Sequence, residues 1–228
     1  MLYNPIKYKH TNFRGGGLMP PKQALGTMEG LQADQDFIPA RRIENRDRLI
    51  LSSNQGNYPH CAGYATAGVC EFHHWRTKYY PKQFDGDAIY KKAKELDGRP
   101  DVNGTWPEYA ISAAIQLDFI RGQGKAFGNS KKDIQFALHE YDVAIGGFMI
   151  DDNWNYVDRK TGRIMDKPDM RKLGGHAVCL CGYDEEGLYI QNSWGENWGL
   201  YGFALIPWSM VERQYMMGMV IVPTPMAA

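Results

Sequence analysis

The stretch "NSWGENWGLYGFALIPW", from Asn192 to Trp208, is the most specific part of this sequence. A glycine- and tryptophan-rich turn opens it, and a short run of β-forming residues follows. Upstream, "GGHAVCLCGYD" puts His176 at the start of another β-rich run, 16 residues before Asn192 (192 − 176 = 16). A strand, a turn at "DEEG" and a return strand fit this interval. We therefore predict an antiparallel hairpin that places Asn192 beside His176.

This pair has the composition of an oriented base. The amide of Asn192 can accept a hydrogen bond from one ring nitrogen of His176 and direct the other nitrogen towards a nucleophile. Trp194 could cover that hydrogen bond and exclude water. A single His before a strand is more often structural, so the interpretation depends on finding a nucleophile elsewhere in the chain.

The segment "NQGNYPHCAGYA", Asn54 to Ala65, supplies a candidate nucleophile. Cys61 begins a run that we expect to be helical, and unpaired N–H groups at a helix start favour a thiolate. Gln55 could donate from its side-chain amide to a developing oxyanion, together with the Cys61 N–H. Taken singly, Cys61 could be a buried packing thiol and Gln55 a solvated loop residue.

The order Gln, Cys, His, Asn-Ser-Trp-Gly resembles the papain-like cysteine peptidases, over roughly Asp36 to the C-terminus. The resemblance implies an α+β fold of two lobes, a helical N-terminal lobe and an antiparallel β-sheet or barrel, with the active site in the cleft between them. It implies a cysteine endopeptidase without cofactor or metal. Cys61 would be the nucleophile, His176 the acid/base, Asn192 the orienting residue and Gln55 the oxyanion donor.

The sequence also departs from the family pattern. The first Cys of C-G-[SA]-C-[WY] is absent, and His60 precedes Cys61. Separations of 115 (176 − 61) and 131 (192 − 61) residues indicate a shortened region between nucleophile and base. The chain has four cysteines, at positions 61, 70, 179 and 181, and this number and clustering do not indicate a disulfide framework. The chain therefore resembles a disulfide-free, bacterial or viral branch, which leaves the substrate pocket open.

Composition restricts the partners. The 228 residues are 43% hydrophobic and carry 26 basic and 26 acidic side chains, which gives no reason to expect nucleic acid or an anionic membrane as partner. No apolar stretch approaches 18 residues and no signal peptide is apparent. Free cysteines favour a cytoplasmic or otherwise reducing compartment, with a virion also compatible. The expected partner is a polypeptide substrate.

The pattern changes along the chain. Residues 1–35 read as an irregular arm, residues 36–125 as a helical lobe with Gln55 and Cys61, and residues 126–228 as a β-rich lobe with His176 and Asn192. Helices are expected at 61–80, 87–96, 107–122 and, more weakly, 131–141. Short strands are expected in "DVAIGGFMI", "HAVCLCGYD", "GLYIQNSWG", "YGFALIPW" and "MGMVIVP".

Candidates for the substrate pocket follow from the resemblance. Trp194 is one of these candidate substrate-binding residues. "NGTW" is similar to a segment whose backbone binds extended substrate, which would use Gly104 and Thr105. Further lining residues would be Val143, Gly174 and Ala177. An ordinary turn or core role explains these residues equally well.

Several alternatives stay open. The chain could be a non-catalytic binding or virion-assembly protein on the same fold, or a transamidase or isopeptidase with the same residues. Cys70 with His73 or His74 has zinc-like spacing but lacks a second ligand pair. The arm could self-interact with the cleft, and Cys61 could cleave the arm after Arg14 in "NFRGGG"; a surface-packed arm is the simpler expectation.

Overall fold

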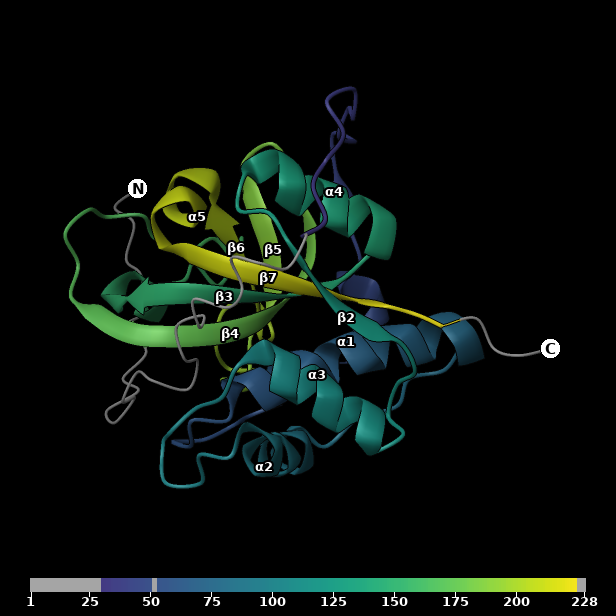
Figure 1. The fold of residues 1–228 in the computed structure, drawn as a ribbon. Helices are drawn as coiled ribbons and strands as arrows, with labels where there is room; N and C mark the ends of the chain where they lie inside the picture. The colour runs from purple at the N-terminus through teal and green to yellow at the C-terminus, as the bar shows by residue number, and fades with distance from the viewer. Residues whose placement is uncertain (1–29, 51–52, 225–228) are drawn as a thin grey trace.

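The computed structural model describes residues 30–50 and 53–224 (Figure 1). Within them the chain alternates short helical and extended elements before the β-rich second half. The elements are β1 (Ile43–Glu44), η2 (Arg46–Arg48), α1 (Cys61–Lys78), α2 (Gly86–Asp97), α3 (Pro107–Gln116), β2 (Gln123–Phe127), α4 (Lys131–Tyr141), β3 (Ala144–Asp151), η3 (Asp152–Asn155), β4 (Lys172–Tyr183), β5 (Gly187–Gln191), β6 (Phe203–Pro207), α5 (Trp208–Gln214) and β7 (Tyr215–Val222).

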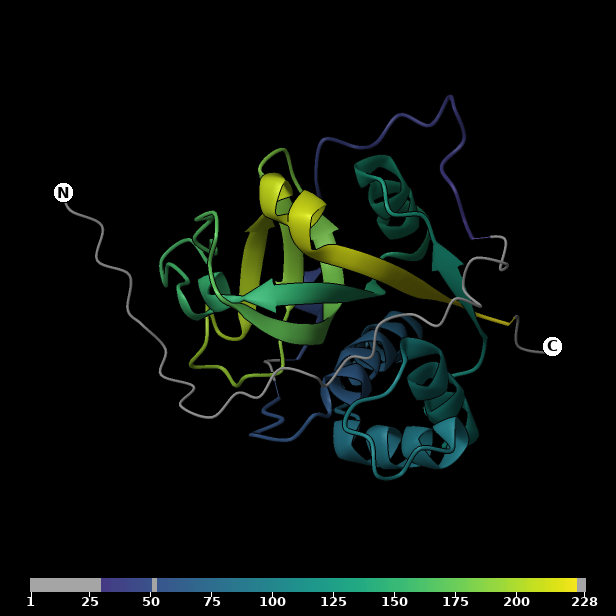
Figure 2. The same ribbon diagram turned by 60° about the vertical axis from the view of Figure 1, so that its left-hand side comes forward.

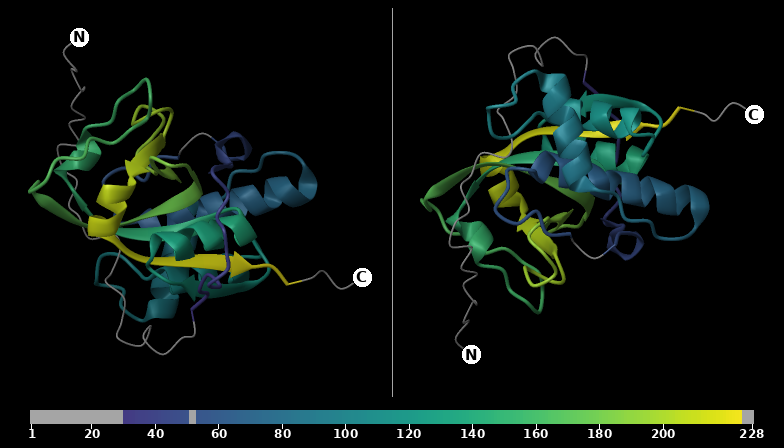
Figure 3. Two further views of the ribbon diagram at one scale, coloured as in Figure 1. Left: turned by 90° about the horizontal axis from the view of Figure 1, so that it is seen from above. Right: turned by 90° about the horizontal axis from the view of Figure 1, so that it is seen from below.

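The strands form one antiparallel sheet in the order β2-β7-β3-β4-β5-β6, with β1 added to β4. Helices α1, α2 and α3 lie together on one side of the sheet, and α4 and α5 lie on the other (Figures 1 and 2). Seen from above, α4 lies along β7, which it contacts (Figure 3). This arrangement is the expected α+β fold, with a helical layer facing an antiparallel sheet.

Strand β4 separates two hydrophobic cores. Its side chains alternate, as those of a strand must: Cys179 and Cys181 pack into the core shared with α1, α2 and α3. Val178 and Leu180 point into the second core, on the side of α4 and α5. Cys179 and Cys181 thus share one face of β4, and all four cysteines are buried free thiols.

Helix α1 is the central helix and lies tightly against its neighbours. A Cβ added at Gly63 would meet the Gly86 oxygen at 2.2 Å, and one at Gly68 would meet Oε1 of Gln191 at 2.3 Å. These glycines weaken a helix by about 1 kcal/mol each relative to Ala. The close approach of α2 and β5 explains why α1 has glycine at these two positions.

The first helix, the second and Lys131–Tyr141 lie where the sequence predicted them, but α3 ends at Gln116 rather than near Gly122. The chain turns there through Asp118, whose φ is 54°. Strand β2 was missed because "QGKAF" has little hydrophobic signal; its pairing with β7 defines it. Helix α5 was also not predicted; it lies between the runs "YGFALIPW" and "MGMVIVP" and shares only Trp208 with the first.

The boundary expected at residue 125 stays a prediction, and strands pair across it. β2 crosses it, and β1 pairs with β4 although residues 36–125 were assigned to the helical lobe. The last residues of the predicted arm follow the sheet edge, where the Leu31 N–H donates to the Ala126 oxygen at 2.8 Å. Cleavage after Arg14 and self-interaction of the arm concern residues outside the described part of the chain.

Candidate active site

Cys61 is the first residue of α1, and only 1% of it is exposed. Its thiol lies within hydrogen-bonding reach of the backbone N–H groups of Ala177, Ala62 and Cys61 itself. Ala177 belongs to β4, so the thiol sits where the helical layer meets the sheet. Because residue 177 directly follows His176, β4 brings the predicted nucleophile and the predicted base to the same place.

The predicted hairpin is present. β4 and β5 are antiparallel, with Cys179 opposite Gln191, and the turn between them is tied by the Asp184 carboxylate. Asn192 follows β5, and its Oδ1 lies 2.8 Å from Nε2 of His176. An amide oxygen only accepts, so Nε2 carries the proton in the neutral ring and Nδ1 has the lone pair. Asn192 thus fixes the tautomer that a general base needs.

Aromatic rings enclose the imidazole. Trp194 lies over it with ring centroids 4.9 Å apart and planes tilted by 34°, as the sequence suggested. Trp154, from η3, meets it edge-on at 5.7 Å and donates its own N–H to Gln214. Trp154 was not predicted, because nothing in a lone tryptophan within a loop connects it with His176. Together the rings bury the imidazole completely.

Gln55 is held against the residues that follow Asn192. The segment before α1 pairs with the one after β5 through an Asn54–Trp194 bridge and a 2.9 Å bond from the Gln55 N–H to the Ser193 oxygen. The Gln55 Oε1 accepts from the Ser193 hydroxyl at 2.5 Å, and Nε2 donates to the Tyr58 oxygen at 2.7 Å. An amide nitrogen carries a second hydrogen, which is the one an oxyanion contact would use.

Burial dominates the ionisation of the pair. It raises the pKa of Cys61 to about 12, against the opposing influence of the neighbouring backbone N–H groups. It lowers the pKa of His176 to about 4, although the bond to Asn192 favours the charged ring. Desolvation at this depth therefore opposes the thiolate that the helix start and the N–H contacts favour.

Comparison with known proteins agrees with this geometry. The sequence model described as "Papain family cysteine protease" matches residues 87–222, which is more than half of the chain. The chain belongs to the papain family. The matched region contains His176 and Asn192 but begins after Cys61, so the assignment of the nucleophile in this papain-family protein depends on the structure around α1.

Relatives of this papain-family chain include a viral protein and bacterial and protozoan structures. An uncharacterized peptidase C1-like protein, L477, of Acanthamoeba polyphaga mimivirus is 30% identical over 151 residues, which cover 64% of this chain and 44% of that protein. Xylellain, a cysteine protease from Xylella fastidiosa, superposes with a TM-score of 0.78 at 15% identity over 99% of this chain and 100% of its own. Procathepsin B S9 from Trypanosoma congolense gives 0.70 at 14% identity, over 93% and 87%.

The structure does not favour Gly104 as a substrate-binding residue. Its N–H donates to the Tyr90 hydroxyl at 3.0 Å, and its oxygen accepts from Lys94 at 3.0 Å. Both backbone groups that would bind an extended peptide are thus used within the protein. Thr105 is fully buried and donates from its hydroxyl to Asp97 at 2.8 Å. The side chains of this predicted segment hold α2 and the loop before α3 together.

The other predicted pocket residues separate in space. Val143 is fully buried in the core shared with α1, α2 and α3, which is the packing role left open from the sequence. Gly174 is partly exposed in β4 at a φ of 128°, a conformation that suits glycine. Ala177 lies beside the Cys61 thiol. Of these three, Ala177 and Gly174 flank His176 on β4 and remain compatible with substrate contact.

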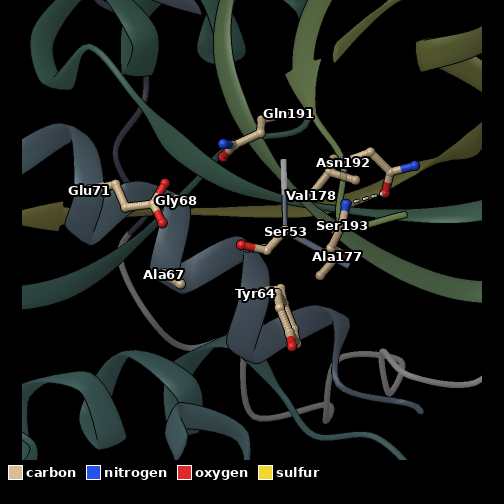
Figure 4. Close-up of a pocket in the computed structure, with 11 residues that line it drawn as sticks. Ser53, Tyr64, Ala67, Gly68, Glu71, Ala177, Val178, Gln191, Asn192 and Ser193 are labelled. Carbon is tan, nitrogen blue, oxygen red and sulfur yellow. Dashed lines mark hydrogen bonds between the residues drawn. The ribbon is translucent and has the colours of Figure 1, made fainter. Parts of the chain in front are cut away.

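A small polar pocket lies next to this site, between α1 and the sheet (Figure 4). Tyr64, Gly68 and Glu71 line it from α1, and Ala177 and Gln191 line it from β4 and β5. Glu71 is 4% exposed, and its Oε1 accepts from the Phe84 N–H at 3.5 Å. Burial raises the pKa of Glu71 to about 7. The sequence alone gave no reason to select Glu71.

The zinc alternative gains no support. Across residues 30–50 and 53–224, no three His, Cys, Asp or Glu side chains gather as metal ligands would.

Within the same ranges, no helix has the length and apolar character required to cross a bilayer.

Proposed function

We propose that this chain is a cysteine endopeptidase with Cys61 as nucleophile, His176 as acid/base and Asn192 as orienting residue. One observation carries the proposal: His176 is hydrogen-bonded to Asn192, and the backbone N–H of Ala177, the next residue of β4, lies within reach of the Cys61 thiol. Membership of the papain family supports a peptidase as the general class.

The reaction would proceed through a thioester. His176 takes the thiol proton on Nδ1 while the Cys61 sulfur attacks the peptide carbonyl carbon. The oxyanion is received by the Cys61 N–H and the second N–H of Gln55. His176 then protonates the departing amine as the C–N bond breaks. Water, deprotonated by His176, hydrolyses the thioester and restores the thiol.

Ionisation of the pair would accompany opening of the site. Transfer of a proton from Cys61 to His176 creates no net charge, and water or substrate entering the site reduces the desolvation that opposes it. The neutral pair is then a resting form. We accordingly expect slow reaction with thiol reagents at neutral pH unless the site opens, and faster reaction as the pH rises.

The test is hydrolysis of a mixed peptide library under reducing conditions, with products identified by mass spectrometry. Cys61→Ala and His176→Ala should each lower turnover by about four orders of magnitude or more, without unfolding. Cys70→Ala removes another buried thiol of the same helix and is the matched control, which should retain activity. Normal turnover by Cys61→Ala would refute the proposal.

Near-complete burial of Cys61 and His176 favours one second candidate, a non-catalytic binding protein on this fold. In that case wild-type protein and Cys61→Ala would both leave every peptide intact. Product analysis with an added primary amine separates hydrolysis from transamidation, because a transamidase would attach the amine to the new carboxyl end.

The natural substrate of the proposed enzyme would be a polypeptide. Four buried free thiols support action in a reducing compartment. The mimivirus relative supports examining virions as well. Immunodetection in fractionated cells and purified particles would decide between these locations.

A further inference from the structure

His60 directly precedes Cys61, and its side chain turns away from α1. It occupies the N-cap position, yet it makes no side-chain cap hydrogen bond to the helix. Its ring Nδ1 instead lies 2.7 Å from Oδ1 of Asp87, in the first turn of α2. The side chain is 15% exposed, so it faces neither bulk solvent nor the thiol but the neighbouring helix.

Two tyrosines hold the His60 ring from both faces. Tyr90 of α2 stacks on it with centroids 4.0 Å apart and planes within 25°, and Tyr58 stacks at 5.3 Å and 22°. We call Tyr58, His60, Asp87 and Tyr90 the His60 clamp. A ring that is stacked on both sides and hydrogen-bonded at its edge has little rotational freedom.

Both proposed oxyanion donors are attached to this clamp. Nε2 of Gln55 donates to the backbone carbonyl oxygen of Tyr58 at 2.7 Å, and this bond orients the Gln55 amide. The Cys61 N–H shares a peptide plane with the His60 carbonyl, which accepts from the Tyr64 N–H at 3.2 Å. The His60 side chain anchors that plane on one side and α1 anchors it on the other.

We propose that His60 is a positioning residue that fixes the Gln55 amide and the Cys61 N–H for oxyanion stabilisation. The inference rests on the proposed peptidase function of the same site. His60 touches neither substrate nor the reacting atoms; it acts through Tyr58 and through its own peptide bond. The competing explanation is a local hydrogen bond with Asp87 that only stabilises the loop.

His60→Ala should lower kcat about 10- to 100-fold and leave KM within about threefold. Removing one oxyanion donor costs about 10²–10³ in kcat, and a displaced donor costs less than a missing one. KM should change little because the donors act chiefly in the transition state.

Two inhibitors distinguish positioning from structural damage. A peptide aldehyde adds to the thiol and places an oxygen between the oxyanion donors, so His60→Ala should weaken its binding about 10-fold or more. Iodoacetamide alkylates the thiol by displacing iodide and forms no oxyanion. Its rate with Cys61 should be unchanged by His60→Ala, which also reports that the thiol and the fold are intact.

Conservative variants divide the clamp into its parts. His60→Phe keeps an aromatic ring between the tyrosines and should recover much of the kcat lost in His60→Ala, whereas Asp87→Ala removes the partner of Nδ1 and should lower kcat less than His60→Ala does. His139→Ala removes another histidine, on α4, whose ring centroid lies 5.5 Å from that of Phe37. It is the matched control and should leave turnover and aldehyde binding unchanged.

The outcomes are separable. An active wild-type enzyme with unchanged kcat and aldehyde binding in His60→Ala overturns the inference alone. Equal losses in alkylation, aldehyde binding and kcat also overturn it, because they indicate general damage to the site. A wild-type protein that neither hydrolyses peptides nor binds aldehyde overturns the proposed function and the inference together.

Discussion

The hydroxyl of Ser193 donates to Oε1 of Gln55 at 2.5 Å and thereby joins the two ends of the candidate site. Gln55 lies before α1 and Ser193 directly follows Asn192. The pairing of Asn54 with Trp194 and the bond from the Gln55 N–H to the Ser193 oxygen reinforce the contact. The proposed oxyanion donor and the residue that orients the base are therefore held in one unit.

Ser193→Ala should lower kcat about 10-fold and the free energy of unfolding by about 1–3 kcal/mol. It leaves the buried Gln55 oxygen without its donor and releases the orientation of the amide. Peptide turnover and urea unfolding measure the two effects. Ser112→Ala is the control, because that exposed hydroxyl bonds only within α3. Equal kcat in the two variants would contradict a role for Ser193.

Asn192→Ala should lower kcat about 100-fold, since the imidazole loses the partner that sets its tautomer. The bond to Asn192 favours charged His176, so the variant should also have a lower His176 pKa. Asn192→Asp places a carboxylate there and should raise that pKa. NMR titration of the imidazole C–H signals checks both directions. An identical His176 pKa in all three proteins would contradict the assignment.

The hairpin that carries His176 and Asn192 was predictable because its pattern is local. Spacing between His176 and Asn192 fits two strands and a turn, and side-chain alternation places Cys179 and Cys181 on one face. Residues far apart were brought together by topology, which no spacing reveals. The partners of His60 lie on α2, so whether it faced the cleft or solvent could not be decided from the sequence.

The substrate-pocket residues stay predictions, and Gly104 shows what the sequence alone could not resolve. The resemblance transferred Gly104 as a backbone donor and acceptor, but Tyr90 and Lys94 already satisfy both groups. Ionisation also depended on context. A helix start favours a thiolate, whereas the depth at which Cys61 is buried raises the pKa of its thiol. Burial is a property of the assembled layers, which the sequence around Cys61 does not encode.

Glu71→Gln should flatten part of the pH dependence of stability between about pH 4.5 and pH 7. Glu71 has a folded-state pKa of about 7 against an ordinary 4.5. The folded protein therefore retains a proton that the unfolded chain releases. This contribution is fully present below pH 4.5 and is lost as the pH rises through 7, by up to about 3 kcal/mol.

Urea unfolding of wild type and Glu71→Gln across this range measures the difference. Burial lowers the pKa of His176 and His73 to about 4, which gives stability the opposite slope between pH 4 and 6.5. Both proteins share those groups, so the difference isolates Glu71. Glu95→Gln, at an exposed carboxylate, is the control and should give a flat difference. A flat difference for Glu71→Gln as well would rule out the buried carboxyl as the cause.

Gly63→Ala should destabilise the protein by about 1–3 kcal/mol although alanine favours helices. The added Cβ would meet the Gly86 oxygen at 2.2 Å and the Tyr90 nitrogen at 2.9 Å, and both are backbone atoms that cannot rotate away. α1 and α2 would have to separate, which would also loosen the His60 clamp. Activity should therefore fall together with the free energy of unfolding.

Gly98→Ala is the control for steric overlap. Nothing lies within 4 Å of a Cβ there, but φ is +65°, so the variant should lose about 1–2 kcal/mol through backbone strain alone. Its kcat should stay at the wild-type value because Gly98 ends α2 far along the helix from Asp87 and Tyr90. Gly63→Ala with wild-type stability and turnover would show that α1 and α2 can move apart freely, and the close helix contact would then not be what places Cys61.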